Sequence, residues 1–174
     1  MSVAEAEAQH DGQLVRLSVS GNGEASVETG LPVLDHLVGV LARYASFDVV
    51  LEVAPDSAEA QIVTAGRALG QALHEPLRAE WARGHGFGEV PDDEALASVA
   101  LDVSERPLVV SNVDLSSVHV AGLETDVVTR FLEELARAAD VVVHVRLAHG
   151  EEPRHVLDSI FKALGVALGD ACRS

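Results

Sequence analysis

The sequence predicts an α/β fold of two layers in which one ββαβα unit occurs twice along the 174 residues. Two observations predict the duplication: the segment 66–73 returns as 161–168 at an offset of 95 residues, and the segment 41–43 returns as 135–137 at an offset of 94. Each copy of the shorter segment runs into a strand rich in β-branched residues. Because such a subunit is pseudo-twofold, a site formed by one half should have a counterpart in the other.

Hydrophobic periodicity predicts the elements of the first half. Alternating apolar and polar residues indicate half-buried strands, apolar residues at helical spacing indicate helices, and Gly21-Asn22-Gly23 predicts a hairpin turn. Residues 1–12 are expected to be a flexible tail or a short edge element. The half then contains, in order, strands over 14–19 and 25–27, a helix over 34–45, a strand over 47–53, and a helical segment over 58–80 that is interrupted near Pro76.

The second half repeats this order after a glycine-rich connector over 84–91. We expect residues 13–90 and 91–174 to be the two halves of one compact pseudo-twofold domain. Their helices should pack against each other, because each has an apolar face that needs cover. The predicted elements are strands over 96–103 and 108–113 joined by a turn at 104–107, a helix over 124–138, a strand over 141–147, and a helix over 153–171.

Composition excludes several classes of protein. Hydrophobic residues make up 48% of the chain but aromatic residues only 3%, so the core must consist of Val, Leu and Ala. The formal net charge of −16 argues against a nucleic-acid partner, and no apolar run is long enough to span a membrane. The acidic segment 4–7 is unlike a secretory signal, and a single cysteine, Cys172, fits a reducing compartment. A cytoplasmic location is therefore expected.

Four segments together resemble the imidazoleglycerol-phosphate dehydratase family of histidine biosynthesis. They read TGLPVLDH over 29–36, PDDEAL over 91–96, DVSERP over 102–107 and RHVLDSIFKA over 154–163. The resemblance extends from about residue 14 to residue 171, and the order and spacing of the segments make it specific. It implies a duplicated ββαβα fold of the ribosomal protein S5 domain 2-like type, in agreement with the internal repeat.

The resemblance also implies a reaction that needs two manganese ions, which hold the substrate imidazole as its anion while water is lost. In the family, each half supplies a helical His-His-x-x-Glu motif and one further histidine. Here the first motif falls on 59–63, which contains no histidine, and arginine stands at two histidine positions, Arg130 and Arg154, where it would repel a dication. A complete two-metal site is therefore not expected. The residual ligands are His36, His155 and Asp158.

The phosphate-binding positions of the family are better preserved. The resemblance assigns Arg83, Arg106 and Lys162 to the substrate phosphate, and Lys162 is the only lysine in the chain. Fixed positive charge and several N–H donors suit these residue types to phosphate. Glu105 replaces the glycine before Arg106, which places a carboxylate beside that guanidinium. An ordinary surface role for Lys162 is the alternative interpretation.

Other polar residues have two interpretations each. Glu94, in the cluster 92–94, is a candidate acid or base, although acidic residues beside a loop are often only solvated. His36 and His155 are either residual metal ligands or histidines with ordinary hydrogen bonds.

Three hypotheses follow. The first is a divergent relative without the two-manganese dehydration, binding a small phosphorylated ligand. The second is an active dehydratase, and hence a hydro-lyase, with a rebuilt metal site. The third is a non-catalytic partner that co-assembles with a true dehydratase. Loss of metal ligands that join subunits in the family also leads us to expect a homo-oligomer that stops at a trimer rather than at 24 subunits.

Overall fold

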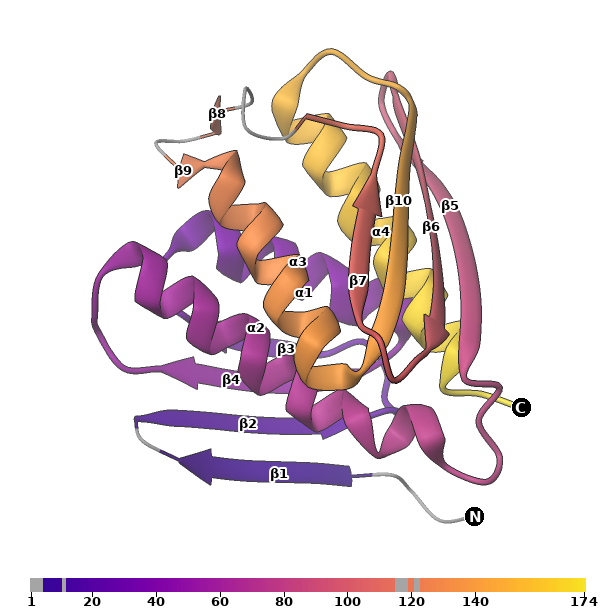
Figure 1. The fold of residues 1–174 in the computed structure, drawn as a ribbon. Coiled ribbons are helices and arrows are strands. Elements are labelled where there is room, and N and C mark those ends of the chain that lie inside the picture. Colours follow the sequence, from indigo (N-terminus) through magenta and orange to yellow (C-terminus); the bar gives the residue numbers. More distant parts are fainter. Residues whose placement is uncertain (1–4, 11, 115–118, 121–122) are drawn as a thin grey trace.

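Two four-stranded sheets enclose a layer of helices in the computed structural model, which describes residues 5–10, 12–114, 119–120 and 123–174 (Figure 1). The first sheet has the order β1-β2-β4-β3, with β1 Glu5–His10, β2 Gln13–Ser18, β3 Ala25–Glu28 and β4 Asp48–Val53. The second has the order β5-β6-β10-β7, with β5 His85–Asp92, β6 Ala95–Val103, β7 Leu108–Ser111 and β10 Val141–His149. The helices are α1 Pro32–Ala45, α2 Ala58–His74, the 3-10 turn η1 Pro76–Arg78, α3 Thr125–Ala139 and α4 Pro153–Ala171, and the short β8 His119–Val120 pairs with β9 Leu123–Glu124.

The two halves have the same topology, which confirms the predicted duplication and the α/β fold class. In each sheet, two antiparallel pairings are followed by a parallel edge strand, β3 beside β4 and β7 beside β10. The predicted helices and the internal strands lie where periodicity placed them, within a few residues at their ends.

The predicted hairpin at Gly21-Asn22-Gly23 is wrong, because β2 and β3 do not pair with each other. β4 lies between them and pairs with both. The Asp48 carboxylate at the start of β4 accepts hydrogen bonds from the N–H groups of Asn22, at 2.8 Å, and Glu24, at 3.0 Å. These bonds hold the turn around the end of β4, so the chain crosses to the far side of that strand.

Two segments outside the predicted strands are edge strands. Residues 5–10, expected as a flexible tail or a short edge element, form the edge strand β1, and most of the connector 84–91 lies in β5. Each half is therefore βββαβα, and the second sheet begins at His85 rather than at the expected boundary of 91. In β5 the inward positions are Gly86 and Gly88, where a Cβ atom would collide with the α4 carbonyls of Ala167 and Ala163. The strand consequently lacks apolar side chains at these two inward positions, which weakens the alternation by which a strand is recognised in a sequence.

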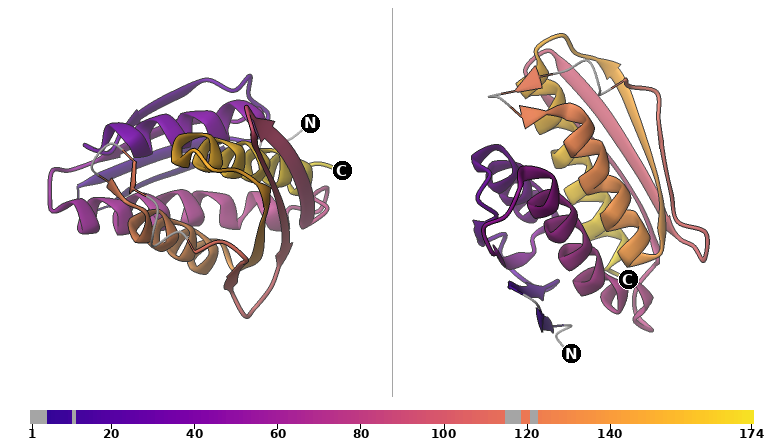
Figure 2. Two further views of the ribbon diagram at one scale, coloured as in Figure 1. Left: turned by 90° about the horizontal axis from the view of Figure 1, so that it is seen from above. Right: turned by 60° about the vertical axis from the view of Figure 1, so that its left-hand side comes forward.

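Helices of the two halves pack directly against each other, as expected from their apolar faces: α1 lies along α4, and α2 lies along α3 (Figure 2). Glycines permit this approach. A Cβ atom on Gly70 would lie 2.5 Å from the carbonyl oxygen of Leu135, and one on Gly165 would lie 2.5 Å from that of Leu41. Gly66 and Gly169 make similar approaches to α3 and α1. The helix layer is thus shared between the halves.

The core is aliphatic, as the composition predicts. Only three aromatic side chains are among the largest fully buried ones, Phe47, Phe131 and Phe161, and the last two stack with their ring centroids 5.9 Å apart. Cys172 is buried and unpaired, and burial raises the pKa of its thiol to about 12. Among the described residues, no helix has both the length and the apolar character needed to cross a membrane.

The glycine contacts predict opposite effects of two alanine substitutions. Gly165→Ala should lower the free energy of unfolding by about 1–3 kcal/mol, because the new methyl group overlaps Leu41 and Tyr44 of α1. The matched control is Gly39→Ala in α1, where nothing lies within 4 Å of the added Cβ. That change should raise the free energy of unfolding by about 0.5–1 kcal/mol through helix propensity. Urea unfolding measures both, and equal effects of the two substitutions would contradict close packing at Gly165.

Candidate functional site

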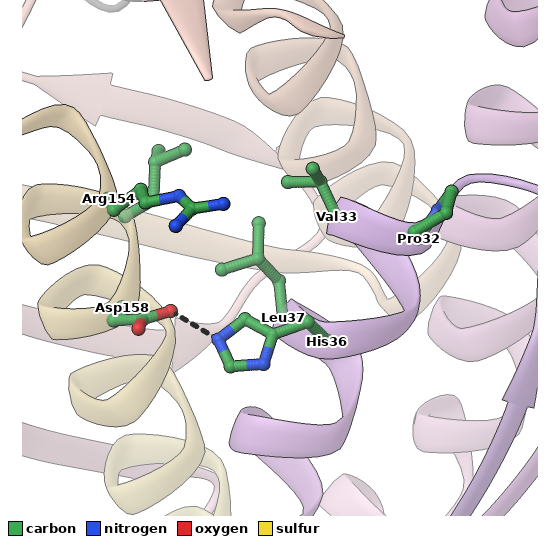
Figure 3. A pocket seen from close by; sticks show the side chains of 7 residues that line it. Pro32, Val33, His36, Leu37, Arg154 and Asp158 are labelled. Carbon is green, nitrogen blue, oxygen red and sulfur yellow. Dashed lines mark hydrogen bonds and ion pairs between the residues drawn. The ribbon is translucent and has the colours of Figure 1, made fainter. Parts of the chain in front are cut away.

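A cavity of about 440 Å³ lies between the first turns of α1 and α4 (Figure 3). Both helices begin with a proline, Pro32 and Pro153, whose fixed φ suits the first helical position. Asp35 accepts hydrogen bonds from the buried Thr29, from its N–H at 2.8 Å and its hydroxyl at 2.5 Å, which holds the chain leading into α1. The lining residues are Pro32, Val33, His36, Leu37, Arg154, Leu157 and Asp158.

His36 and Asp158 meet at one side of this cavity. His36 Nε2 lies 2.8 Å from Asp158 Oδ1, joining α1 to α4, and Figure 3 shows the pair at one side of the cavity. The His36 side chain is 59% exposed and that of Asp158 is 23% exposed, so the pair is open to solvent. Two of the three residual metal ligands expected from the sequence therefore meet, and they meet as a hydrogen-bonded pair.

His155, the third expected ligand, lies in a different cluster. Its Nδ1 is 2.6 Å from Glu94 Oε2, and its Nε2 is 3.2 Å from Asp93 Oδ2, in the tight turn between β5 and β6. Consecutive helical residues point in directions about 100° apart. For this reason His155 turns toward the strands while Arg154 turns toward α1.

Glu94 forms hydrogen bonds both with His155 and with the backbone at the start of α4. Its Oε1 accepts hydrogen bonds from the N–H groups of Glu152, at 2.8 Å, and Glu151, at 3.3 Å. The Glu152 N–H, followed by the hydrogen bond with His155, lowers the pKa of Glu94 to about 2. The hydrogen bond with Glu94 in turn raises the pKa of His155. The arrangement therefore favours an imidazolium between two carboxylates, and a Glu94 carboxyl that stays ionised is suited to positioning rather than to donating a proton.

Lys162 has a carboxylate partner within the chain. Its Nζ lies 2.6 Å from Asp92 Oδ1 and 5.4 Å from the centre of the Tyr44 ring, and the side chains of Lys162 and Asp92 are each 18% exposed. The hydrogen bond with Asp92 raises the pKa of Lys162. The only lysine of the chain is thus a permanent cation whose charge Asp92 offsets.

The three expected phosphate-binding residues do not converge within one chain. Arg83 donates to Asp170 near the end of α4, with Nη1 2.5 Å from Oδ1, and Arg106 is exposed in the turn after β6. These two lie at the same end of the second sheet, since the N–H of Val103 donates to Gly84 O at 2.8 Å. Lys162 lies toward the opposite end of β6, a nine-residue strand with a rise of about 3.3 Å per residue.

One further ion pair was not anticipated from the sequence. Arg130 Nη1 on α3 lies 2.6 Å from Glu59 Oε1 on α2. The internal repeat relates α3 to α1 and α2 to α4, so Arg130 is the counterpart of His36, and Glu59 is the counterpart of Arg154. Glu59 stands one helical turn before residue 63, the position that the repeat matches to Asp158. Opposite charges near the starts of both helices were visible in the sequence, but their contact depends on how the helices cross.

The comparisons with known proteins agree with the motifs. The family described as imidazoleglycerol-phosphate dehydratase matches residues 29–168. A protein of that name from Desulforudis audaxviator is 36% identical over 163 residues, which cover 91% of this chain and 83% of the relative. Another from Syntrophobacter fumaroxidans is 37% identical over 161 residues, covering 90% and 82%.

Solved structures agree as well. The crystal structure of imidazoleglycerol-phosphate dehydratase from Staphylococcus aureus superposes with a TM-score of 0.89 at 26% identity, covering 98% of each chain. The enzyme from Pyrococcus furiosus, solved in complex with (S)-C348, has a TM-score of 0.82 at 25% identity, covering 97% of this chain and 94% of that one.

The Glu94–His155 contact predicts a pH profile of stability. Because the pKa of Glu94 is lowered by folding, its ionised carboxylate stabilises the folded state above about pH 4.5, and this stabilisation is lost as the pH falls toward 2. Because the pKa of His155 is raised by folding, its imidazolium stabilises the folded state below about pH 6.5, and this stabilisation is lost as the pH rises through the folded-state pKa. Glu94→Gln should therefore reduce stability most between these limits and should lower the pKa of His155, which NMR titration of the imidazole measures.

The control for this prediction is Glu151→Gln. It removes a neighbouring negative charge and keeps the backbone N–H that donates to Glu94. A fall in the pKa of His155 that is as large in Glu151→Gln as in Glu94→Gln would contradict the assigned hydrogen bond.

Proposed function

The chain belongs to the imidazoleglycerol-phosphate dehydratase family, and from this premise we propose that it is a dehydratase-like protein that does not use the family's two manganese ions. One observation carries the proposal. In both halves, positions matched to metal ligands are occupied by pairs that link helices, His36 with Asp158 and Arg130 with Glu59.

The donor set does not fit a pair of manganese ions. Such ions take several imidazole and carboxylate ligands each, whereas the segment 59–63 has no histidine and guanidinium groups stand at two expected histidine positions, Arg130 and Arg154. Loss of an outer hydrogen-bond partner alone costs a metal site about 10–100-fold in affinity or activity. Loss of most of the direct ligands should therefore abolish a two-metal site.

We further propose that a small phosphorylated ligand, if it is bound through Arg83, Arg106 and Lys162, is bound between subunits. These residues lie apart in a single chain, and two of them are paired with Asp170 and Asp92. A homo-oligomer would bring different ends of the second sheet together. We propose a trimer rather than a 24-subunit particle, because metal ligation that joins subunits in the family has lost its ligands here.

A second candidate function is an active dehydratase with a rebuilt metal site. One cluster among the described residues favours it: Asp92, Asp93 and His155 each offer a ligand atom, and these atoms lie within 4.8 Å of one another. Against it, Asp92 is paired with Lys162, and the raised pKa of His155 favours the protonated form that cannot bind a metal.

Metal analysis and an activity assay test the proposal together. Protein purified without chelator and without a histidine tag should contain fewer than two manganese ions per chain by elemental analysis. It should show no manganese-dependent elimination of water from imidazoleglycerol phosphate, because the groups that would hold both ions are missing. Two tightly bound manganese ions per chain with turnover of this substrate would contradict the proposal.

Two matched substitutions separate the two candidate functions. If a rebuilt site binds manganese, Asp93→Asn should weaken that binding by about tenfold or more, whereas Asp102→Asn, an exposed carboxylate outside the cluster, should not. Equal, weak binding by wild type and both variants would indicate surface association only and would reject the rebuilt site.

A further inference from the structure

We propose that the cavity between α1 and α4 binds a small organic monocarboxylate with a branched apolar body, and that it does so without a metal ion. The inference rests on the proposed function, since it assigns a ligand to the place where family metal-ligand positions carry other side chains. It goes beyond that function by naming a ligand class and a residue, Arg154, that the phosphate-binding set does not include.

Arg154 provides the anion-binding group. Its exposed side chain extends from α4 across the cavity toward α1 (Figure 3), and within the described part of the chain it has no hydrogen bond or ion pair. Asp158 stands one helical turn later, at the i+4 position where a carboxylate commonly pairs with an arginine. Here the Asp158 carboxylate is hydrogen-bonded to His36 instead, with Nε2 2.8 Å from Oδ1. The guanidinium is left with its planar array of donors, which matches a carboxylate with two parallel hydrogen bonds.

The remaining walls select an apolar body. Four of the seven lining residues are aliphatic or proline: Pro32, Val33, Leu37 and Leu157. The cavity volume of about 440 Å³ falls in the range typical of small-molecule pockets, about 300–1,000 Å³, and exceeds what an inorganic anion would fill. A ligand with a compact, branched hydrocarbon group would remove these walls from water while its charged end reaches Arg154.

The charges of the cavity favour a monoanion over a dianion. Arg154 is its one permanent cation, and the Asp158 carboxylate lies on the same helix face. A phosphate monoester would bring up to two negative charges against one guanidinium and one carboxylate. A carboxylate would bring one charge, which the guanidinium can offset.

The net charge of −16 does not prevent such binding. At physiological ionic strength the Debye length is about 8 Å, so distant surface carboxylates are largely screened. The adjacent guanidinium of Arg154 therefore determines which sign of charge a ligand in the cavity should carry. The second ring nitrogen of His36 is also without a hydrogen bond among the residues that the structure describes, and it is available to a polar group on the ligand.

Calorimetric titration with 3-methylbutanoate in the presence of EDTA tests the assignment. We expect saturable binding that is at least about tenfold tighter than binding of the neutral isostere 3-methylbutan-1-ol or of inorganic phosphate. Arg154→Gln should weaken the binding by about tenfold or more, the range expected for a charge-assisted pair. Arg43→Gln is the matched control, because it removes an exposed arginine from the distant end of α1 with the same change in charge.

Each outcome decides the question. Tight binding of 3-methylbutanoate that is lost in Arg154→Gln and kept in Arg43→Gln supports the inference. Absence of binding to the folded, metal-free protein, equal weakening by both variants, or preference for phosphate overturns it while the proposed function stands. Binding that appears only when about two manganese ions per chain are added overturns both.

Discussion

The close contact of helices from opposite halves is the constraint on which the rest of the structure depends. Each sheet presents one apolar face, and the helix layer between the sheets must cover both. Glycines at the crossings, Gly70 and Gly165 among them, let the carbonyl oxygens of the facing helix come within the space that a Cβ would occupy. Because interiors are close-packed, this approach leaves little freedom in how α1 lies on α4 or α2 on α3. The distances between side chains near the helix starts follow from it.

The two inter-helix pairs are a direct consequence of these crossings. His36 reaches Asp158 and Arg130 reaches Glu59 because the pseudo-twofold relation places the starts of both helix pairs face to face, although Glu59 lies one turn before the position matched to Asp158. Both pairs are substantially exposed, so each contributes at most about 1 kcal/mol to stability. His36 and Asp158 are residue types that can ligate a metal, whereas Arg130 and Glu59 form an ordinary ion pair.

α4 divides its chemistry between two surfaces. Arg154 and Asp158, one turn apart, face α1, whereas His155 faces the turn between β5 and β6, where Glu94 holds both its imidazole and the N-terminus of the helix. Lys162, two turns further along α4 from His155, meets Asp92 beside the same turn. The helix period thus separates the cavity beside α1 from a cluster of opposite charges whose members are paired with one another.

What the sequence determined by itself is the duplication, the helices, the internal strands, the aliphatic core and the family, because these depend on local periodicity, composition and motif spacing. It left residues 5–10 open between a flexible tail and a short edge element, and it did not reveal β5, where Gly86 and Gly88 have no side chains that could produce a pattern. It also did not reveal which charged residues would meet. The sequence grouped His36, His155 and Asp158 as one residual set, and Arg83, Arg106 and Lys162 as another. Only the crossing of the helices and the register of β5 on β6 decided that Asp158 meets His36, His155 meets Glu94, and the three basic groups lie apart, since partners far apart in sequence are selected by tertiary geometry.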